Sequence, residues 1–396
     1  MNPNSLFNSP NALAKYYKHF SVDKRILLTG HSHQAWPDCS RDAQLQAWDD
    51  AAMSVDDKWD KVFERQERVR KGFLNLLDDD SYLSFGQNTH ELLVRFLSAL
   101  PLKQRPKLLT SAGEFHSISR QLSRLEEENI QVIRVLNEPI SNVVPQLIDK
   151  LCMKTAAVLI SSVFFQNGQI LEGLDQLYEA CQKVGAELLI DTYHHLNVVP
   201  FSIKKNNLEN AYVLGGGYKY CQLGEGVCFL RYPKSCELRP VITGWFADFE
   251  HLDDLCSKSQ ISYTSKNNRF AGATFDPTSF YRAAAVFEFF KKHKLTVELL
   301  RTVSQHQIAL LADRFDNMNF DPQLIRRDTN ISIDKIGGFL ALKTKYAKDI
   351  SEKLKNTLIY SDVRSDLLRL GPAPYISDDQ LHSAMDCIEE ITLSKL

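Results

Sequence analysis

Lys219 follows the apolar run 211–214 and the three glycines 215–217, which is a costly place for a charged side chain. Burial disfavours a protonated ammonium, and a lysine that loses its proton becomes a nucleophilic amine. Such an amine can form a Schiff base with an aldehyde cofactor. Asp191 ends an earlier apolar run, where its carboxylate could hold a protonated ring nitrogen. A lysine and an acidic residue at the ends of successive strands are what pyridoxal phosphate requires.

A phosphate group needs backbone N–H groups at the start of a helix, together with hydroxyls. The segment 86–91 fits this need, because a strand pattern ends at Phe85 and a helical pattern begins near His90. Asn88 and Thr89 lie in the turn between them, although an ordinary capped helix would carry the same residues. Phe115 follows another strand end and could stack on a flat ring, or it could be plain core.

Arg369 lies among apolar residues and therefore needs an anionic partner. Its planar guanidinium can hold a carboxylate through two parallel hydrogen bonds, or it can form a structural salt bridge. His31 and His33 suggest a metal site, but a third ligand at suitable spacing is missing. The glycines 215–217 follow neither G-x-G-x-x-G nor a Walker loop, so dinucleotide and ATP sites receive little support.

Size and composition are those of an ordinary globular protein. The 396 residues suit two domains, and a net charge of −2 gives no reason to expect nucleic acid or an anionic membrane as a partner. The N-terminus lacks the pattern of a signal peptide, and no apolar stretch reaches the ~18–20 residues that span a bilayer. We therefore expect a cytoplasmic protein, whose eight scattered cysteines are reduced.

Alternating strand and helix patterns position these residues. The predicted strands of the first part are 25–28, 82–85, 107–110, 131–135, 156–160, 185–190, 211–214 and 226–230. The predicted helical segments among them are 36–77, 90–100, 115–127, 140–151 and 171–184. Later come helices 278–293 and 296–318, strands 338–343, 358–363 and 367–370, and a final helix from Asp378.

This alternation predicts an α/β protein with a mainly parallel sheet, seven-stranded in type, that helices cover on both faces. The change of pattern after about residue 278 predicts a smaller α/β domain at the C-terminus. We expect an N-terminal arm of residues 1–45 that joins the small domain, a cofactor-binding large domain of residues 46–275, and a small domain of residues 276–396.

Taken together, these residues resemble the fold-type I pyridoxal-phosphate enzymes of the class V aminotransferase group, and within it most of all kynureninase. Asp191 and His194 match the family's D-x-x-H, and residues 218–220 match its Y-K-Y. Residues 244–245 match its G-W, and the segment 362–375 matches D-V-R-x-x-x-x-x-R-x-x-P-x-P-x-Y. The similarity runs from about residue 25 to residue 380 with the order of motifs preserved.

The resemblance implies a pyridoxal 5′-phosphate site with catalytic Lys219 on the aldehyde and Asp191 on the ring nitrogen. The cofactor-binding residues that it implies are Asn88, Thr89, Phe115, Asp191, His194, Tyr218, Lys219 and Thr274. Thr274 lies in a segment closer to the G-x-T of cysteine desulfurases, whose threonine reaches the phosphate of a neighbouring subunit. The substrate-binding residues that it implies are Arg369, on the α-carboxylate, with Trp245, Ser32 and His31.

The resemblance implies a kynureninase-like hydrolase that cleaves the Cβ–Cγ bond of an amino acid to give alanine and an aryl acid. The alternatives are a class V aminotransferase, an epimerase or a C–S β-lyase, or a binding protein that keeps the fold without the chemistry. A cysteine desulfurase is less favoured, because no cysteine lies between Cys256 and Cys387, where that family's nucleophile belongs. The family also implies a homodimer with shared active sites.

Overall fold

The main sheet of the protein has seven strands. The computed structural model describes residues 1–256 and 260–393, and the strands lie in the spatial order β2-β8-β7-β6-β5-β3-β4. Their bounds are β2 Tyr82–Gly86, β3 Lys107–Ser111, β4 Gln131–Val135, β5 Thr155–Ser161, β6 Glu187–Asp191, β7 Tyr212–Gly216 and β8 Cys228–Tyr232. Of these, β8 runs antiparallel to both of its neighbours, and the other pairings are parallel. The predicted, mainly parallel sheet is confirmed.

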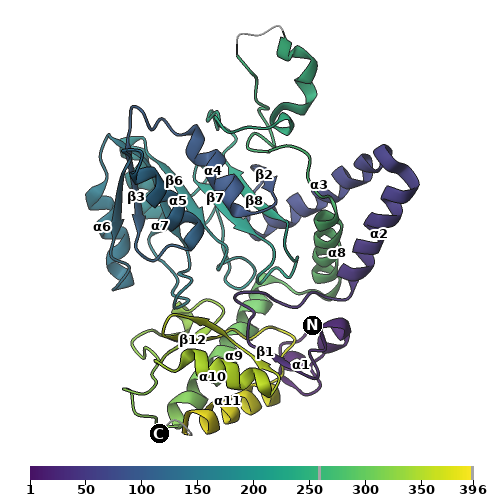
Figure 1. The fold of residues 1–396 in the computed structure, drawn as a ribbon, viewed down its shortest axis with the longest axis vertical. Helices are drawn as coiled ribbons and strands as arrows, with labels where there is room; N and C mark the ends of the chain where they lie inside the picture. The colour runs from purple at the N-terminus through teal and green to yellow at the C-terminus, as the bar shows by residue number, and fades with distance from the viewer. Residues whose placement is uncertain (257–259, 394–396) are drawn as a thin grey trace.

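Helices cover both faces of this sheet, which explains why its strands read as continuous apolar runs. In β5, Ala157 and Leu159 belong to one buried cluster, whereas Val158 and Ile160 belong to the other. The first cluster contains side chains of α4 Thr89–Ala99 and α5 His116–Glu126. The second contains side chains of α3 Lys58–Leu76, α6 Val143–Lys150, α7 Leu174–Val184 and α8 Thr278–His293. The layers are visible in Figure 1.

The parallel strands place polar residues at one edge of the sheet. Ser111, Ser161 and Asp191 are the last residues of β3, β5 and β6. Ser161 and Asp191 are direct partners in the register of β5 and β6. In open α/β sheets this edge, at the carboxyl ends of the strands, is where ligands bind.

A second, antiparallel sheet lies in the C-terminal part of the chain, in the order β11-β12-β9. The strands are β9 Leu340–Lys343, β11 Asp362–Arg364 and β12 Leu367–Leu370. Leu368 and Leu370 belong to the apolar core, as do side chains of α9 Val297–Asn317, α10 Ala347–Asn356 and α11 Asp378–Leu393. Arg369 alternates with these leucines and pairs in register with Asp362, so both side chains lie on the opposite face of the small sheet.

The N-terminal arm belongs to this C-terminal half of the molecule. Its strand β1 Ile26–Leu27 pairs in parallel with β10 Ile359–Tyr360. Gly30 and Gly371 continue the pairing, since the Gly30 N–H donates to the Gly371 carbonyl at 2.8 Å. Figure 1 accordingly places the N-terminus in the same half of the molecule as the small sheet, away from the main sheet. We propose that the large domain ends near residue 275, although α8 packs against α2 Cys39–Ser54 and α3.

Two sequence predictions differ from the structure in detail. The helical stretch predicted for residues 36–77 is divided, because α2 ends at Ser54 and α3 begins at Lys58. Val55 between them has a φ of 45°, a left-handed conformation that no α-helix of L-residues contains. The strand predicted for residues 358–363 is likewise two short strands, β10 and β11, in different sheets.

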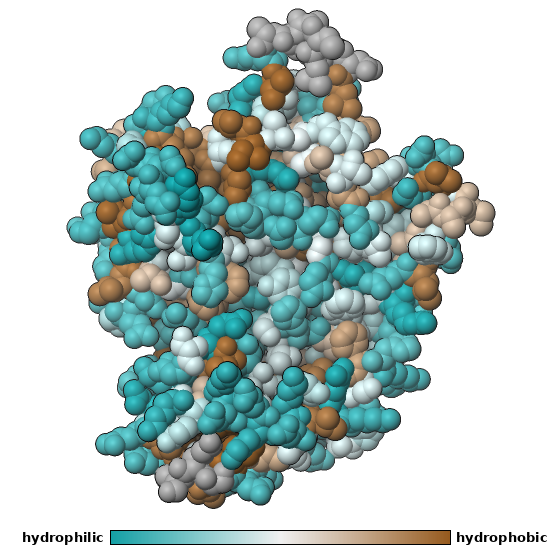
Figure 2. All heavy atoms as spheres, in the orientation of Figure 1, coloured by the Kyte–Doolittle hydropathy of each residue, from teal (hydrophilic) through white to brown (hydrophobic). Residues whose placement is uncertain are grey.

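One segment projects beyond the main sheet at the top of Figure 1. It carries the 3-10 helix η5 Trp245–Cys256. Its exposed apolar side chains are Val241, Ile242, Trp245, Phe249 and Ile261. Figure 2 shows apolar residues gathered at this end of the molecule. Among the described residues, none of the helices combines the length and the hydropathy needed to cross a bilayer.

Candidate active site

Lys219 lies just beyond the end of β7 and is buried, with 5% of its surface exposed. Its amine lies 5.0 Å from the centroid of the Tyr193 ring, 5.4 Å from that of Phe115 and 5.7 Å from that of Tyr218. Burial is the largest cause that lowers the pKa of Lys219 to about 7; the charge of Asp191 opposes this shift and that of Arg369 contributes to it. A lysine with this pKa has a large fraction of neutral amine near pH 7, as the chemistry expected of it requires.

His194 and Asp191 face this amine from the neighbouring strand. Nε2 of His194 lies 2.5 Å from Nζ of Lys219. Burial lowers the pKa of His194 well below its usual value, so the ring is neutral and Nε2 can accept a hydrogen bond from the lysine. Nδ1 of His194 is buried without a hydrogen-bond partner. Burial raises the pKa of Asp191, while the Tyr193 N–H, at 2.8 Å from Oδ1, and the charge of Lys219 both stabilise its ionised form.

The glycines before Lys219 allow this close approach of the chain segments. A Cβ placed on Gly216 would lie 2.4 Å from the hydroxyl oxygen of Tyr193, and one on Gly217 would lie 2.7 Å from the Cβ of Leu223. Both contacts are far shorter than van der Waals distance, so a side chain at either position would displace β7 or the ring beside the amine. The three glycines therefore serve packing at the site.

Arg369 forms the centre of a second group of residues, on the small sheet. It is 2% exposed, and its Nη2 donates to Asp362 while Nη1 donates to the carbonyl oxygen of Phe165. Its guanidinium also lies 5.3 Å from the ring centroid of Phe339. Nε is buried without a partner. Burial lowers the pKa of Arg369 to about 10, so the side chain stays positively charged at neutral pH.

His31, predicted to bind substrate, lies beside the Asp362 that holds Arg369, whereas Ser32 and His33 have other surroundings. His31 is fully buried, stacks on Phe339 with 4.4 Å between ring centroids, and places Nε2 3.3 Å from Oδ2 of Asp362. The Ser32 hydroxyl instead donates to the Thr29 carbonyl at 3.2 Å within a turn. His33 stacks on Tyr218 with 4.8 Å between centroids, so the two histidines point to different partners.

The two groups meet through aromatic side chains. Phe165, whose carbonyl binds Arg369, packs edge-on against Phe115 with 5.3 Å between ring centroids. His194, in contact with Lys219, lies 6.2 Å from the Phe339 ring that covers Arg369. A cavity of about 630 Å³ opens beside Phe165, with walls from the small sheet that include Arg364. The groups around Lys219 and Arg369 are therefore joined by contacts between aromatic side chains.

The predicted phosphate turn begins α4. Asn88 is its N-cap and accepts a hydrogen bond from the Glu91 N–H at 3.0 Å. Burial raises the pKa of Tyr218 to about 12, so its hydroxyl stays protonated and is able to donate. The N-terminus of α4 and the ring of Tyr218 both belong to the carboxyl-end edge of the main sheet.

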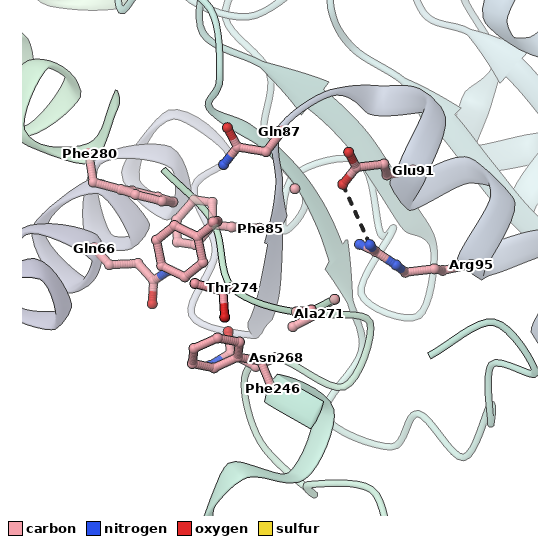
Figure 3. Close-up of a pocket in the computed structure, with 14 residues that line it drawn as sticks. Gln66, Phe85, Gln87, Glu91, Arg95, Phe246, Asn268, Ala271, Thr274 and Phe280 are labelled. Carbon is pink, nitrogen blue, oxygen red and sulfur yellow. Dashed lines mark hydrogen bonds and ion pairs between the residues drawn. The ribbon is translucent and has the colours of Figure 1, made fainter. Parts of the chain in front are cut away.

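Thr274 and Trp245 are placed outside the group around Lys219. Thr274 is exposed and lines a cavity of about 270 Å³ together with Gln87 and Glu91 of the α4 turn. Figure 3 shows Thr274 among Phe85, Asn268 and Phe246, with Glu91 and Arg95 paired at 3.5 Å nearby. Trp245 packs on Phe246, 4.2 Å between ring centroids, and is 42% exposed. Within one chain, neither residue is brought to the Lys219 amine.

Sequence reasoning missed several residues of the site. Glu114 is buried and accepts hydrogen bonds from Ser111 and Ser161. Asp362 holds both Arg369 and His31, and Phe339 covers both of them. Glu114 directly precedes Phe115, so an acidic residue at a strand end was a usable signal for it. Nothing local in the sequence marks Phe339.

Known proteins match this chain over nearly its whole length, at low sequence identity. No family model matches the chain. Among curated proteins, the uncharacterized aminotransferase YcbU of Bacillus subtilis (strain 168) is 20% identical over 387 residues, which cover 94% of this chain and 98% of that protein.

Solved structures of similar fold include several enzymes of known activity. A complex of the cystine C–S lyase C-DES with its product cysteine persulfide has a TM-score of 0.81 at 14% identity, over 94% of this chain and 99% of that one. A C-DES variant with glycine covalently linked to the PLP cofactor reaches 0.82 at 14% identity, over 95% and 98%. Apo cysteine desulfurase from Thermococcus onnurineus NA1 reaches 0.80 at 15% identity, over 97% and 98%. The chain thus has the α/β fold of these proteins.

Proposed function

We propose that this chain is a pyridoxal-phosphate-dependent enzyme that transforms an amino acid, with Lys219 as its covalent attachment point. The observation that carries the proposal is the Lys219 amine itself, whose pKa burial lowers to about 7 and which lies 2.5 Å from neutral His194. A buried lysine is expensive unless its neutral amine is used, so a purely structural role gives no reason for it. The C-DES variant, which has the same fold, carries PLP as its cofactor and so adds support.

The side chains present fit this cofactor group by group. The neutral amine of Lys219 suits an aldehyde, and the Asp191 carboxylate suits a protonated ring nitrogen. Phe115 offers an aromatic face, with its ring centroid 5.4 Å from the lysine nitrogen. The N-terminus of α4 and the Tyr218 hydroxyl suit a phosphate. The buried Nδ1 of His194, which has no partner in the protein, is a further group that a ligand can satisfy.

When bound, PLP withdraws electrons from the bonds at Cα of an amino acid that is joined to its aldehyde. Arg369 would hold the α-carboxylate of that amino acid, since its Nε has no protein partner and its charge is desolvated. Lys219, displaced by the amino group of the substrate, would then take the proton from Cα. Its lowered pKa keeps the amine available as a base near pH 7. Neutral His194 can accept a hydrogen bond from that amine and so orient it.

Among the possible outcomes, transamination has the support of the aminotransferase YcbU, which aligns with 94% of this chain. C–S bond cleavage is the second candidate, because a cystine C–S lyase has the same fold at a TM-score of 0.81. The kynurenine-type hydrolysis expected from the sequence finds no support in either comparison. A desulfurase that carries sulfur on its own thiol is disfavoured near Lys219, because burial raises the pKa of Cys228 to about 12 and keeps it protonated.

Turnover of a panel of amino acids tests the proposal. The purified protein, loaded with PLP, is incubated with each amino acid, with and without a keto acid as amino acceptor. A transaminase yields a new keto acid only when the acceptor is present. A C–S lyase yields sulfide, ammonia and pyruvate from cysteine without an acceptor. Alanine and an aryl acid from kynurenine would restore the hydrolase hypothesis. A protein that turns over none of them and stays colourless with PLP would be a binding protein.

We further propose that the enzyme is a homodimer in which Thr274 and Trp245 serve the site of the partner. Thr274 is exposed beside the α4 turn, and Trp245 lies among other exposed apolar side chains on the projecting segment. Exposed apolar groups of this kind are typical of protein interfaces. Sedimentation of the wild-type protein decides the matter, and a monomeric mass at micromolar concentration contradicts the proposal.

A further inference from the structure

Glu114 is a buried carboxyl that the proposed chemistry does not use. It follows β3 in the turn before Phe115, and 4% of its surface is exposed. Its Oε1 accepts a hydrogen bond from the Ser111 hydroxyl at 2.6 Å, and its Oε2 accepts one from the Ser161 hydroxyl at 2.5 Å. In the part of the chain that the structure describes, these partners are hydroxyls and none is a cation. A buried carboxyl held in this way is not part of a structural ion pair.

The two serines connect Glu114 with Asp191. Ser111, Ser161 and Asp191 end the strands β3, β5 and β6, which are consecutive neighbours in the sheet. Ser161 is the direct register partner of Asp191. Parallel neighbours lie about 4.8 Å apart, and partnered residues point to the same face. Ser161, whose hydroxyl binds Glu114, therefore lies next to Asp191 on the adjacent strand.

Burial and the charge of Asp191 together change how readily Glu114 ionises. Burial raises the pKa of Glu114 to about 7, the two serine hydroxyls oppose that rise, and the negative charge of Asp191 adds to it. Asp191 is the ionisable group that acts on Glu114, and Lys219 acts on Asp191 from the other side. Arg369 and Arg364 act in turn on Lys219. Two carboxylates in such proximity resist double ionisation, so a proton on Glu114 leaves the negative charge on Asp191.

We propose that Glu114 is a positioning residue for Asp191: a buried carboxyl, held by Ser161 next to Asp191, whose ionisation sets how much negative charge the site presents to the ring nitrogen of a bound cofactor. The inference rests on the proposed function, because it assigns Glu114 a role toward that cofactor. Ionised Glu114 would place a second negative charge near Asp191. That charge favours protonation of the ring nitrogen and of the nitrogen that joins the cofactor to Lys219. Neutral Glu114 removes that bias.

The test compares the PLP-loaded wild-type protein with Glu114→Gln, which fixes the side chain in a neutral form of the same shape. Visible absorbance is titrated from about pH 5.5 to 9. We expect the midpoint of the absorbance titration to be lower in the variant than in wild type by about 0.5–1 pH unit. This is the effect of removing one charge several ångströms away in a partly desolvated site. Glu187→Gln is the matched control. It removes a second, half-buried carboxyl of raised pKa from the opposite end of β6, and it should leave the midpoint unchanged.

A second measurement uses the cofactor-free protein. The unfolded carboxyl has its ordinary pKa near 4.5 and the folded one a pKa of about 7. Wild type should therefore lose stability to urea relative to Glu114→Gln as pH rises between these values, and the difference should be constant below them. Asp191→Asn removes the negative charge that helps to raise the pKa of Glu114. In a protein that carries Asp191→Asn, the loss of stability caused by Glu114 should therefore end at a lower pH. A loss that ends at the same pH would mean that the two carboxyls do not interact.

The outcomes separate the inference from the proposed function. Identical absorbance titrations of wild type and Glu114→Gln overturn the inference while the function stands, as does an equal shift in Glu187→Gln. A wild-type protein that never becomes coloured with PLP overturns the function and this role with it. If Glu114→Gln does not fold, Ser161→Ala takes its place. Without the Ser161 hydroxyl as a donor, the pKa of Glu114 should rise, and the loss of stability with pH should extend to higher pH. A loss of stability at the same pH as in wild type would contradict a role for Ser161.

Discussion

Lys219→Ala is expected to lose all visible absorbance from lysine-linked cofactor and at least about 10³-fold in kcat, because alanine has no amine to join the aldehyde or to take the proton. In the folded protein the Lys219 nitrogen lies against three aromatic rings and His194, so alanine leaves a small space and does not disturb the strands. Absorbance after addition of PLP and single-turnover rates with the best amino acid measure the two losses. Lys205→Ala, at an exposed lysine, is the matched control and should behave as wild type.

The cofactor-free variant should also change the pH dependence of stability in a definite direction. The pKa of Lys219 falls from its ordinary value near 10.5 to about 7 on folding. Between these values the unfolded chain binds the proton and the folded chain does not, so wild type gains stability as pH rises from about 7 to 10.5. Lys219→Ala lacks this gain, and is therefore expected to be the more stable protein at pH 6 by a few kcal/mol, with the difference shrinking toward pH 10. An unchanged pH profile would mean that Lys219 is not buried as a neutral amine.

Arg369→Lys is expected to lower kcat/KM for the amino-acid substrate by about 10²-fold, mainly through a higher KM, while the visible spectrum of the bound cofactor stays normal. A lysine keeps the charge but cannot offer two parallel donors to a carboxylate, and each charge-assisted hydrogen bond of this kind contributes roughly 1.5–3 kcal/mol. The affected contact lies on the small sheet, away from the strands that hold Lys219 and Asp191. Steady-state kinetics beside an absorbance titration with PLP separates the two effects.

The control for this variant is Lys343→Met, which removes a different cation from the same sheet. Lys343 pairs with Asp366 at 3.4 Å and is half exposed, so its loss should leave KM unchanged. Arg369→Met adds a further distinction. It leaves Asp362, which is close to His31, with only the more distant Arg364 guanidinium as a cationic partner, and so it should also reduce stability. If Arg369→Lys binds substrate as wild type does, Arg369 is a structural partner of Asp362 and not the carboxylate clamp.

Much of the site was predictable because strand ends are visible in a sequence. Asp191 and Lys219 end apolar runs that the structure places on neighbouring parallel strands, and parallel strands end at a common edge. The pairing of Arg369 was less predictable. The sequence leaves open whether its partner is a ligand or a protein carboxylate, and the choice of Asp362 depends on the register of two strands.

The contacts that the sequence does not predict join residues that are far apart along the chain. Glu114 owes its surroundings to Ser161, 47 positions later, and no periodicity encodes that contact. His31 joins Asp362 across 331 positions. The division of the predicted 36–77 helix also escaped prediction, because the apolar spacing is nearly continuous across Val55 while its backbone is not helical. The location of Thr274 and Trp245 relative to Lys219 depends on whether a second chain is present.

The pairing of the N-terminal strand β1 with β10, more than 300 residues later, affects the order in which the chain folds during synthesis. All seven strands of the main sheet lie between residues 82 and 232, so the surroundings of Lys219 can begin to assemble while the C-terminal third is still being synthesised. The strand of the arm has no pairing partner until residues 358–371 emerge, since β1 pairs with β10 and Gly30 pairs with Gly371. Contacts between such distant segments form slowly because the intervening loop must close first. We therefore expect the nascent chain to gain a place for its cofactor well before it gains the means to select a substrate.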